Sequence, residues 1–260
     1  MSYENLLLEK EGPVATITLD RPQNLNALSM RLREELLSAF QDVRDDSGVR
    51  VLIITGRGRA FCSGADLREL QALTSGQVPP GVMDLATQRV LSVVEMGKPT
   101  IAAINGVAAG GGFSLAMMCD IRLMARGARL ISTFTKRGLV PDGGLTYTLT
   151  QAVGAARACE LIFSADGVDA EQAERLGLVN GVVPDGELTD ACKSLALTIS
   201  QNAPLALRAA KEAIYLAHRG DLKASLDFEA RSQMGLFRTW DFQEGISSFL
   251  EKREPVFRGE

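Results

Sequence analysis

The stretch Lys98–Asp120, KPTIAAINGVAAGGGFSLAMMCD, decides how the rest of the chain is interpreted. Its residues Thr100–Ile104 are apolar and partly β-branched, which predicts a strand. Asn105-Gly106 ends that strand, and Gly110–Gly112 exposes bare backbone before a helix predicted over Phe113–Met118. A glycine-rich turn at a helix N-terminus directs backbone N–H groups at one point and favours negative charge there. The charge can belong to a bound anion or to an oxyanion that forms during a reaction.

The same stretch is open to other interpretations. Three glycines can simply let a helix pack closely on a sheet. The spacing of a dinucleotide-binding turn or of a phosphate-binding P-loop is absent after Ile104. Ile101–Cys119 is uncharged like a membrane span, but its four glycines and Asn105 favour a buried turn in a globular core.

The composition narrows the function classes. The chain has 260 residues, 46% hydrophobic and 23% charged, with a net charge of −4, so it predicts a globular protein without a nucleic-acid partner. The N-terminus lacks the pattern of a signal peptide, and we expect a cytoplasmic protein with no membrane partner. The cysteines are widely spaced and are expected to be buried thiols rather than metal ligands: Cys62, Cys119, Cys159 and Cys192. The single histidine, His218, is expected at a solvated helix end.

Strands and helices alternate up to about Pro184, and the rest of the chain has helical periodicity. We therefore expect an α/β core over residues 1–187 and a helical region over 188–260. The expected strands are Val14–Leu19, Val49–Thr55, Thr100–Ile104, Ile121–Ala125, Arg129–Thr133 and Val179–Val183. The polar segment Thr74–Gly81, TSGQVPPG, is expected to flank an active site.

Several segments in this order resemble the crotonase (enoyl-CoA hydratase/isomerase) superfamily. They are DRPQNLNAL at Asp20–Leu28, AFCSGADL at Ala60–Leu67, Lys98–Asp120, GLVPDGG at Gly138–Gly144 and EGISSFLEKREPVF at Glu244–Phe257. The resemblance implies a spiral of ββα units whose C-terminal helical region builds trimers or hexamers. It also implies an acyl-CoA thioester substrate, with coenzyme A as part of the substrate, no further cofactor and no metal.

The resemblance also implies an oxyanion hole made by the N–H groups of Ala65 and Gly111. Removing a proton next to a thioester carbonyl leaves an enolate, and preorganised donors stabilise its oxygen more than the ground-state carbonyl. A side chain at Gly111 is expected to block the thioester. The other residues implied in binding coenzyme A or the acyl group are Arg21, Asp66, Leu67, Met83, Gly110, Phe134, Leu139, Phe249 and Lys252. Of these, Phe249 and Lys252 are expected to reach a neighbouring subunit's substrate, or else to be core packing and a solvated helix face.

The chain departs from the family in its acid–base residues. Family hydratases use two glutamates, whose positions are occupied here by Ser114 and Phe134. Asp142 is a carboxylate in the second loop, although Pro-Asp-Gly is also an ordinary turn. The segment around it, STFTKRGLVPDGG, resembles isomerases of the phenylacetate pathway. One carboxylate suffices to move a proton between two carbons, so we expect double-bond isomerisation with Asp142 as the shuttle. Glu69 is a secondary candidate.

Other functions remain open from the sequence. Hydration by a non-standard acid and base is one, and a non-catalytic member that binds acyl-CoA or protein is another. A hydrolase is a third, because Ser63, Asp142 and His218 follow the chain order of an α/β-hydrolase triad. Ser63 lacks the flanking glycines of a nucleophile elbow, which weighs against the hydrolase.

Overall fold

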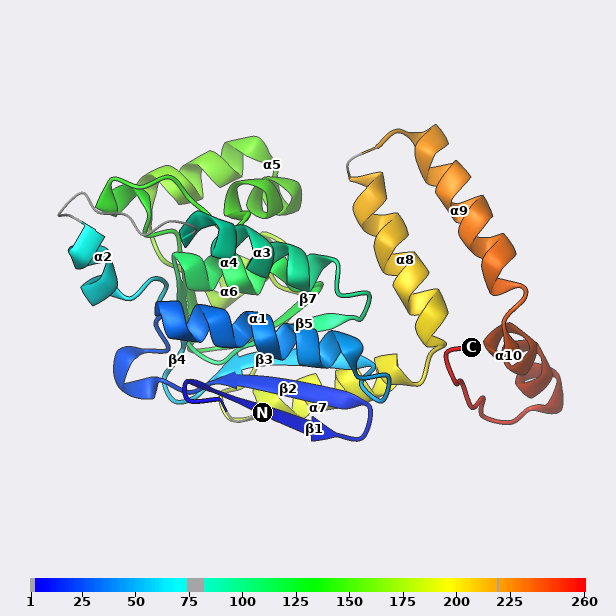
Figure 1. The fold of residues 1–260 in the computed structure, drawn as a ribbon. Helices are drawn as coiled ribbons and strands as arrows, with labels where there is room; N and C mark the ends of the chain where they lie inside the picture. Colours follow the sequence, from blue (N-terminus) through cyan, green and yellow to red (C-terminus); the bar gives the residue numbers. More distant parts are fainter. Residues whose placement is uncertain (1–2, 74–81, 219) are drawn as a thin grey trace.

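The computed structural model describes residues 3–73, 82–218 and 220–260 (Figure 1). The predicted active-site flank Thr74–Gly81 and the side chain of Met83 lie outside the described residues. The protein has an α/β core, and three C-terminal helices stand apart from it at one side.

The larger sheet has six strands in the order β1-β2-β3-β5-β7-β10. Strands β1 and β2 form an antiparallel hairpin, and the remaining pairs are parallel. The strands are β1 (Leu6–Glu11), β2 (Val14–Leu19), β3 (Val51–Gly56), β5 (Thr100–Ile104), β7 (Ile121–Ala125) and β10 (Gly181–Val183). Strands β2, β5 and β7 have the predicted bounds, because β2 and β5 are apolar apart from threonines and β7 is apolar apart from Arg122.

A second sheet has the order β4-β6-β8-β9, with β4 (Ala60–Cys62), β6 (Val107–Ala109), β8 (Arg129–Ile131) and β9 (Val168–Asp169). Along the chain, β3, β5 and β7 of the larger sheet are each followed by a strand of the smaller one. This alternation is the expected spiral of ββα units. Strands β4 and β6 were not among the expected strands, because three-residue strands beside glycines have no alternation to detect.

The helices of the core are α1 (Met30–Asp45), α2 (Leu67–Leu73), α3 (Val82–Val94), α4 (Gly111–Met118), α5 (Leu145–Ser164), α6 (Ala170–Arg175) and α7 (Leu188–Ser200), with short 3₁₀ turns at Pro22–Asn24 and Thr135–Arg137. Helix α1 begins at a capping residue, since the Ser29 hydroxyl accepts from the Leu32 N–H at 3.2 Å. Helix α5 is broken at Gly154, whose backbone angles (φ 75°, ψ 162°) are not helical.

The uncharged run Ile101–Cys119 forms β5, β6 and α4, which are almost wholly buried. Within the described parts of the chain, no helix is both long and apolar enough to cross a membrane. Three cysteines are buried, as expected, but Cys159 is exposed on α5, so that expectation was wrong for it. The sequence around Cys159 has no clear apolar stripe, so it did not predict which face of α5 points toward the core.

The C-terminal arm consists of α8 (Pro204–Ala217), α9 (Leu222–Leu236) and α10 (Trp240–Glu251), and it extends away from the sheets (Figure 1). Helix α7 instead packs on the larger sheet and buries Leu188, Cys192 and Ala196 in the core. The predicted division at residue 187 therefore falls before a helix of the core.

One buried network attaches the arm to the core. Lys211 of α8 donates to Oδ2 of Asp120 at 2.9 Å and to the carbonyls of Val93 and Lys98. Tyr215 donates to Oδ1 of the same carboxylate at 2.7 Å. Since Asp120 directly follows the end of α4, this network joins α8 to the helix that carries Gly111.

Candidate active site

The backbone at Ala65 is held by a parallel bridge to Leu28. The Leu28 N–H donates to the Gly64 carbonyl at 2.7 Å, and the Asp66 N–H donates to the Leu28 carbonyl at 3.3 Å. In a parallel ladder, the residue enclosed by such a pair of bonds has its own N–H on the opposite side. The Ala65 N–H therefore points away from Leu28.

Gly111 is the first residue of α4. The first hydrogen bond of this helix runs from the Ser114 N–H to the Gly110 carbonyl at 3.0 Å, so the Gly111 N–H precedes the bonded turn. The two segments touch, since a Cβ added to Gly64 would lie 3.3 Å from the Gly111 nitrogen. Backbone donors of Ala65 and Gly111 thus come from adjoining segments.

Close packing explains the glycine run. A Cβ on Gly112 would lie 2.0 Å from the Cys62 carbonyl oxygen, which no rearrangement of a side chain can relieve. A Cβ on Gly111 would lie 3.2 Å from Cδ1 of Leu28. Within the protein, a side chain at Gly111 therefore first meets the end of the Leu28 side chain.

Asp142 lies directly over α4. The buried Ser114 hydroxyl donates to the Asp142 main-chain carbonyl at 2.8 Å. The next residue, Gly143, has φ +60°, and a Cβ there would lie 2.9 Å from the Ser114 Cβ. The loop therefore encloses the Ser114 side chain, and the hydrogen bond from this side chain holds the loop against α4.

The Asp142 carboxyl is half-buried, and burial raises its pKa above the ordinary value. The positive charges of Arg89 on α3 and Arg33 on α1 oppose that rise. Arg33 also donates from Nε to the Leu28 carbonyl at 3.1 Å, beside the bridge to Ala65. The site therefore combines backbone donors, one carboxyl with a raised pKa and two guanidinium groups.

Two residues predicted to line the acyl pocket, Phe134 and Leu139, differ in how far they are buried. Phe134 is buried, and a Cβ on Gly110 would lie 4.0 Å from its Cζ. Leu139 is 46% exposed, and its N–H donates to the Phe134 carbonyl at 3.1 Å. Both residues belong to the segment that leads into Asp142.

The predicted coenzyme A residues of the first loop are placed as follows. Arg21 donates to the Ala27 carbonyl at 2.6 Å and pairs with the buried Asp66 at 3.0 Å, so it braces the loop. Leu67 is 59% exposed at the start of α2. Glu69 accepts from the Met30 N–H at 3.0 and 3.1 Å and caps α1, rather than lying free on a solvated face.

The family model described as enoyl-CoA hydratase/isomerase matches residues 9–260. The chain belongs to the enoyl-CoA hydratase/isomerase family. It is 41% identical over 257 residues to a probable enoyl-CoA hydratase of Mycobacterium bovis, covering 99% of each chain. It is 36% identical to the 1,2-epoxyphenylacetyl-CoA isomerase of Escherichia coli, over 98% of this chain and 99% of the isomerase. The crystal structure of an enoyl-CoA hydratase from Bacillus anthracis has a TM-score of 0.93 and 36% identity, over 99% of this chain and 100% of the other.

The hydrolase hypothesis is not supported by the arrangement of its three residues in this family member. Ser63 donates to the Asn24 carbonyl at 3.5 Å. His218 is exposed at the C-terminal end of α8, as expected for a solvated helix end, and that end belongs to the arm (Figure 1). No catalytic triad is therefore assembled.

Phe249 and Lys252 also lie on the arm, at α10, at the opposite end of the molecule from α2 (Figure 1). Phe249 is 82% exposed. A single chain of the enoyl-CoA hydratase/isomerase family member therefore does not bring these two residues to its own Ala65.

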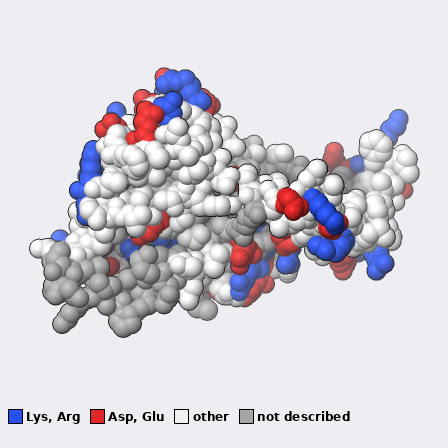
Figure 2. All heavy atoms as spheres, turned by 90° about the horizontal axis from the view of Figure 1, so that it is seen from above, with Lys and Arg blue, Asp and Glu red and all other residues white. Residues whose placement is uncertain are grey.

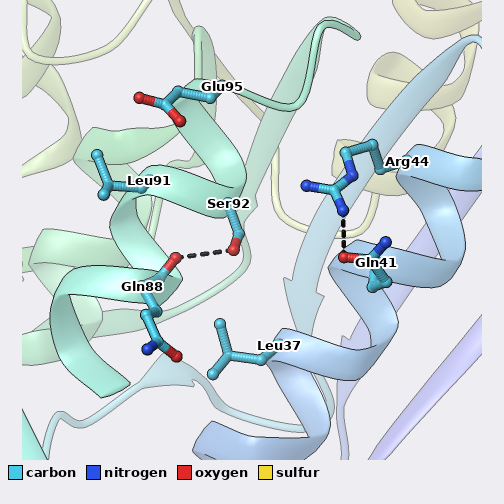
Figure 3. A pocket seen from close by; sticks show the side chains of 7 residues that line it. All are labelled: Leu37, Gln41, Arg44, Gln88, Leu91, Ser92 and Glu95. Carbon is cyan, nitrogen blue, oxygen red and sulfur yellow. Dashed lines mark hydrogen bonds between the residues drawn. The ribbon is translucent and has the colours of Figure 1, made fainter. Parts of the chain in front are cut away.

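Two further surface features lie away from the site. A hollow of about 340 Å³ between α1 and α3 is lined by polar and aliphatic side chains, and Arg44 donates to Gln41 across its edge (Figure 3). None of the predicted site residues lines it. On the face in Figure 2, acidic and basic side chains lie side by side where they gather, including over the arm.

Sequence reasoning missed Arg89 and Arg33. Arg89 lies four residues before the buried Val93 and thus on the core-facing side of α3. A charged residue at an apolar position of a helical pattern is the signal that could have identified it.

Proposed function

We propose that this protein isomerises the double bond of an enoyl-CoA thioester. In the first step, Asp142 removes a proton from a carbon in conjugation with the thioester, and the N–H groups of Ala65 and Gly111 stabilise the enolate oxygen. In the second step, Asp142 returns the proton to another carbon. Electrons and atoms balance within the substrate, so no further reactant is needed.

The observation that carries the proposal is the half-buried carboxyl of Asp142, in a loop whose main chain is bonded to the enclosed Ser114. A carboxyl whose pKa is raised by burial is a stronger base than an ordinary aspartate. The two positions where the family's glutamates are expected hold a hydroxyl that is bonded to the loop and a buried ring. One carboxylate is left to move the proton.

The test replaces Asp142 by asparagine, which keeps the shape of the side chain and removes the base. Binding of a saturated acyl-CoA is expected within about threefold of wild type, while turnover of a 3-enoyl-CoA falls at least 10³-fold, an order of magnitude typical of general-base removal. Nuclear magnetic resonance in deuterated water should show the shifted double bond, with deuterium in the product wherever protonated Asp142 exchanges with solvent before the second step. Retained turnover would exclude Asp142 as the shuttle.

Hydration is the second candidate, because relatives at 38–41% identity are named hydratases. The same spectra separate the two reactions, since hydration yields a 3-hydroxyacyl-CoA and isomerisation yields a shifted double bond. Binding of acyl-CoA without proton exchange at any carbon would instead favour a non-catalytic role.

We further propose that the arm assembles the protein into a homotrimer or hexamer. Its helices expose large apolar side chains to solvent in the single chain, among them Leu222 (75%), Phe249 (82%) and Leu250 (74%). In such an assembly, Phe249 and Lys252 would contact the coenzyme A held by Arg21, Asp66 and Leu67 of a neighbour. Sedimentation velocity measures the assembly, and Phe249→Ala is expected to raise the KM for the CoA ester.

A further inference from the structure

Arg89 is the largest side chain that the core encloses fully, with 2% of its surface exposed. Among the residues that the structure describes, neither its Nε nor its Nη1 has a hydrogen-bond partner. It forms no ion pair in the same part of the chain. A guanidinium group keeps its charge at neutral pH, and buried charges in proteins are ordinarily paired and hydrogen-bonded. The structure therefore contains buried donors without an acceptor.

One edge of this guanidinium, at Nη2, lies at the candidate active site. A Cβ on Gly143 would lie 4.0 Å from Nη2 of Arg89 and 2.9 Å from the Ser114 Cβ. The guanidinium thus borders the same loop that carries Asp142. Cys62 of β4, which packs on Gly112, also lies within electrostatic range of Arg89.

Among the residues that the structure describes, the charges around this point do not balance. The groups that interact with Arg89 are Arg33 of α1, Cys62 of β4 and Asp142 of the loop. Burial raises the pKa of the Cys62 thiol to about 11, so this thiol is neutral at pH 7. Two guanidinium groups therefore face one carboxylate, and a thioester with a hydrocarbon chain adds no further negative charge in its ground state.

We propose that Arg89 binds a carboxylate on the acyl group, so that the substrate class is a CoA monothioester of an unsaturated dicarboxylic acid. The inference rests on the proposed function, since it assumes that this site holds an acyl-CoA. A carboxylate supplies both the missing acceptors and the missing negative charge. A hydroxyl or carbonyl oxygen would supply an acceptor alone.

The test uses saturated esters, which bind without reacting. Calorimetry compares succinyl-, glutaryl- and adipoyl-CoA with the neutral butyryl-, pentanoyl- and hexanoyl-CoA on the full-length protein. At the best chain length, the carboxylated ester is expected to bind about tenfold more tightly than its neutral counterpart, since a hydrogen bond to a charged group is one of the stronger kinds. Neutral esters that bind as well at every length would overturn the proposal.

Matched variants assign the effect to Arg89. Arg89→Gln is expected to reduce the preference for the carboxylated ester to less than about twofold, measured against the neutral ester of the same length in the same variant. Arg44→Gln, on the exposed side of α1, is expected to keep the wild-type preference. A preference for the carboxylated ester that survives in Arg89→Gln would also overturn the proposal. If that variant does not fold, the comparison of the two ester series on the wild-type protein tests the proposal by itself. Binding of neither ester series would overturn the proposed function itself, whereas binding without turnover would overturn only the isomerase activity.

Discussion

The side-chain hydroxyl of Ser114 donates a hydrogen bond of 2.8 Å to the main-chain carbonyl of Asp142. Ser114 belongs to α4, whose first residue is Gly111, and Asp142 carries the proposed base. The bond therefore ties the proposed base to the helix that supplies one of the proposed oxyanion donors.

Replacing Ser114 by alanine should lower kcat with little change in KM. Loss of a hydrogen bond worth about 1 kcal/mol loosens the base relative to the helix and corresponds to roughly a fivefold lower kcat. Steady-state kinetics on an enoyl-CoA measure the effect. Ser92→Ala is the control, since the Ser92 hydroxyl also donates to a main-chain carbonyl, at 2.7 Å, but on the outer side of α3.

Restoring the family's glutamate at position 114 should not create a hydratase. The space beside the Ser114 Cβ is occupied by Gly143, and a longer side chain has to displace the loop that carries Asp142. Ser114→Glu is expected to lose stability, by about 1–3 kcal/mol as for other overpacked sites, and to gain no hydration. Urea denaturation and product analysis check both. A stable variant that hydrates crotonyl-CoA would contradict this expectation.

The activity should depend on pH through the Asp142 carboxyl. The base works when it is deprotonated, so kcat/KM for a neutral enoyl-CoA should rise with pH through the pKa of Asp142, which burial raises. Arg89 and Arg33 oppose the rise, so Arg89→Gln should move the acid limb to higher pH. A profile of kcat/KM between pH 4 and 9 tests the shift, and Arg44→Gln should leave the limb in place.

Lys211→Met should destabilise the fold strongly. The change removes the ion-pair partner of Asp120 and one donor each from the carbonyls of Val93 and Lys98. Breaking a buried pair in this way costs about 3–5 kcal/mol. Lys223→Met is the control, because its pair with Asp227 is exposed and is worth less than about 0.5 kcal/mol. Equal effects of the two changes in urea denaturation would contradict the structural role of Lys211.

Gly112→Ala and Gly235→Ala should act in opposite directions. The added Cβ at 112 meets the Cys62 carbonyl oxygen at 2.0 Å, and the strain should cost about 3 kcal/mol or prevent folding. Gly235 lies in α9 with open space around it, so alanine there should stabilise the helix by about 0.5 kcal/mol. Thermal unfolding of the two variants checks the signs.

Much of the fold could be predicted because local patterns agree with it. The runs of β2, β5 and β7, which are apolar apart from threonines and Arg122, predicted the bounds of these strands to the residue. The short strands β4 and β6 could not be predicted, since they exist through pairing with distant segments rather than through their own pattern.

The site residues that lie in family motifs could be predicted from the sequence, and those outside the motifs could not. Ala65, Gly111 and Asp142 lie in motif segments, and the structure brings their segments to one place. The electrostatic partners of Asp142 lie on α1 and α3, which no motif marks. The sequence did not indicate that Arg21 pairs with Asp66, because this ion pair depends on the fold of the whole loop.

The attachment of Lys211 and Tyr215 to Asp120 has a mechanical consequence. Helix α4 is a rod about 12 Å long, with Gly111 at one end and Asp120 just beyond the other. If α8 tilts, its hydrogen bonds to Asp120 either break or displace the C-terminal end of α4. Movement of α8 therefore acts on the segment that follows α4, and it is opposed there by Thr100 of β5, which bonds to the same carboxylate.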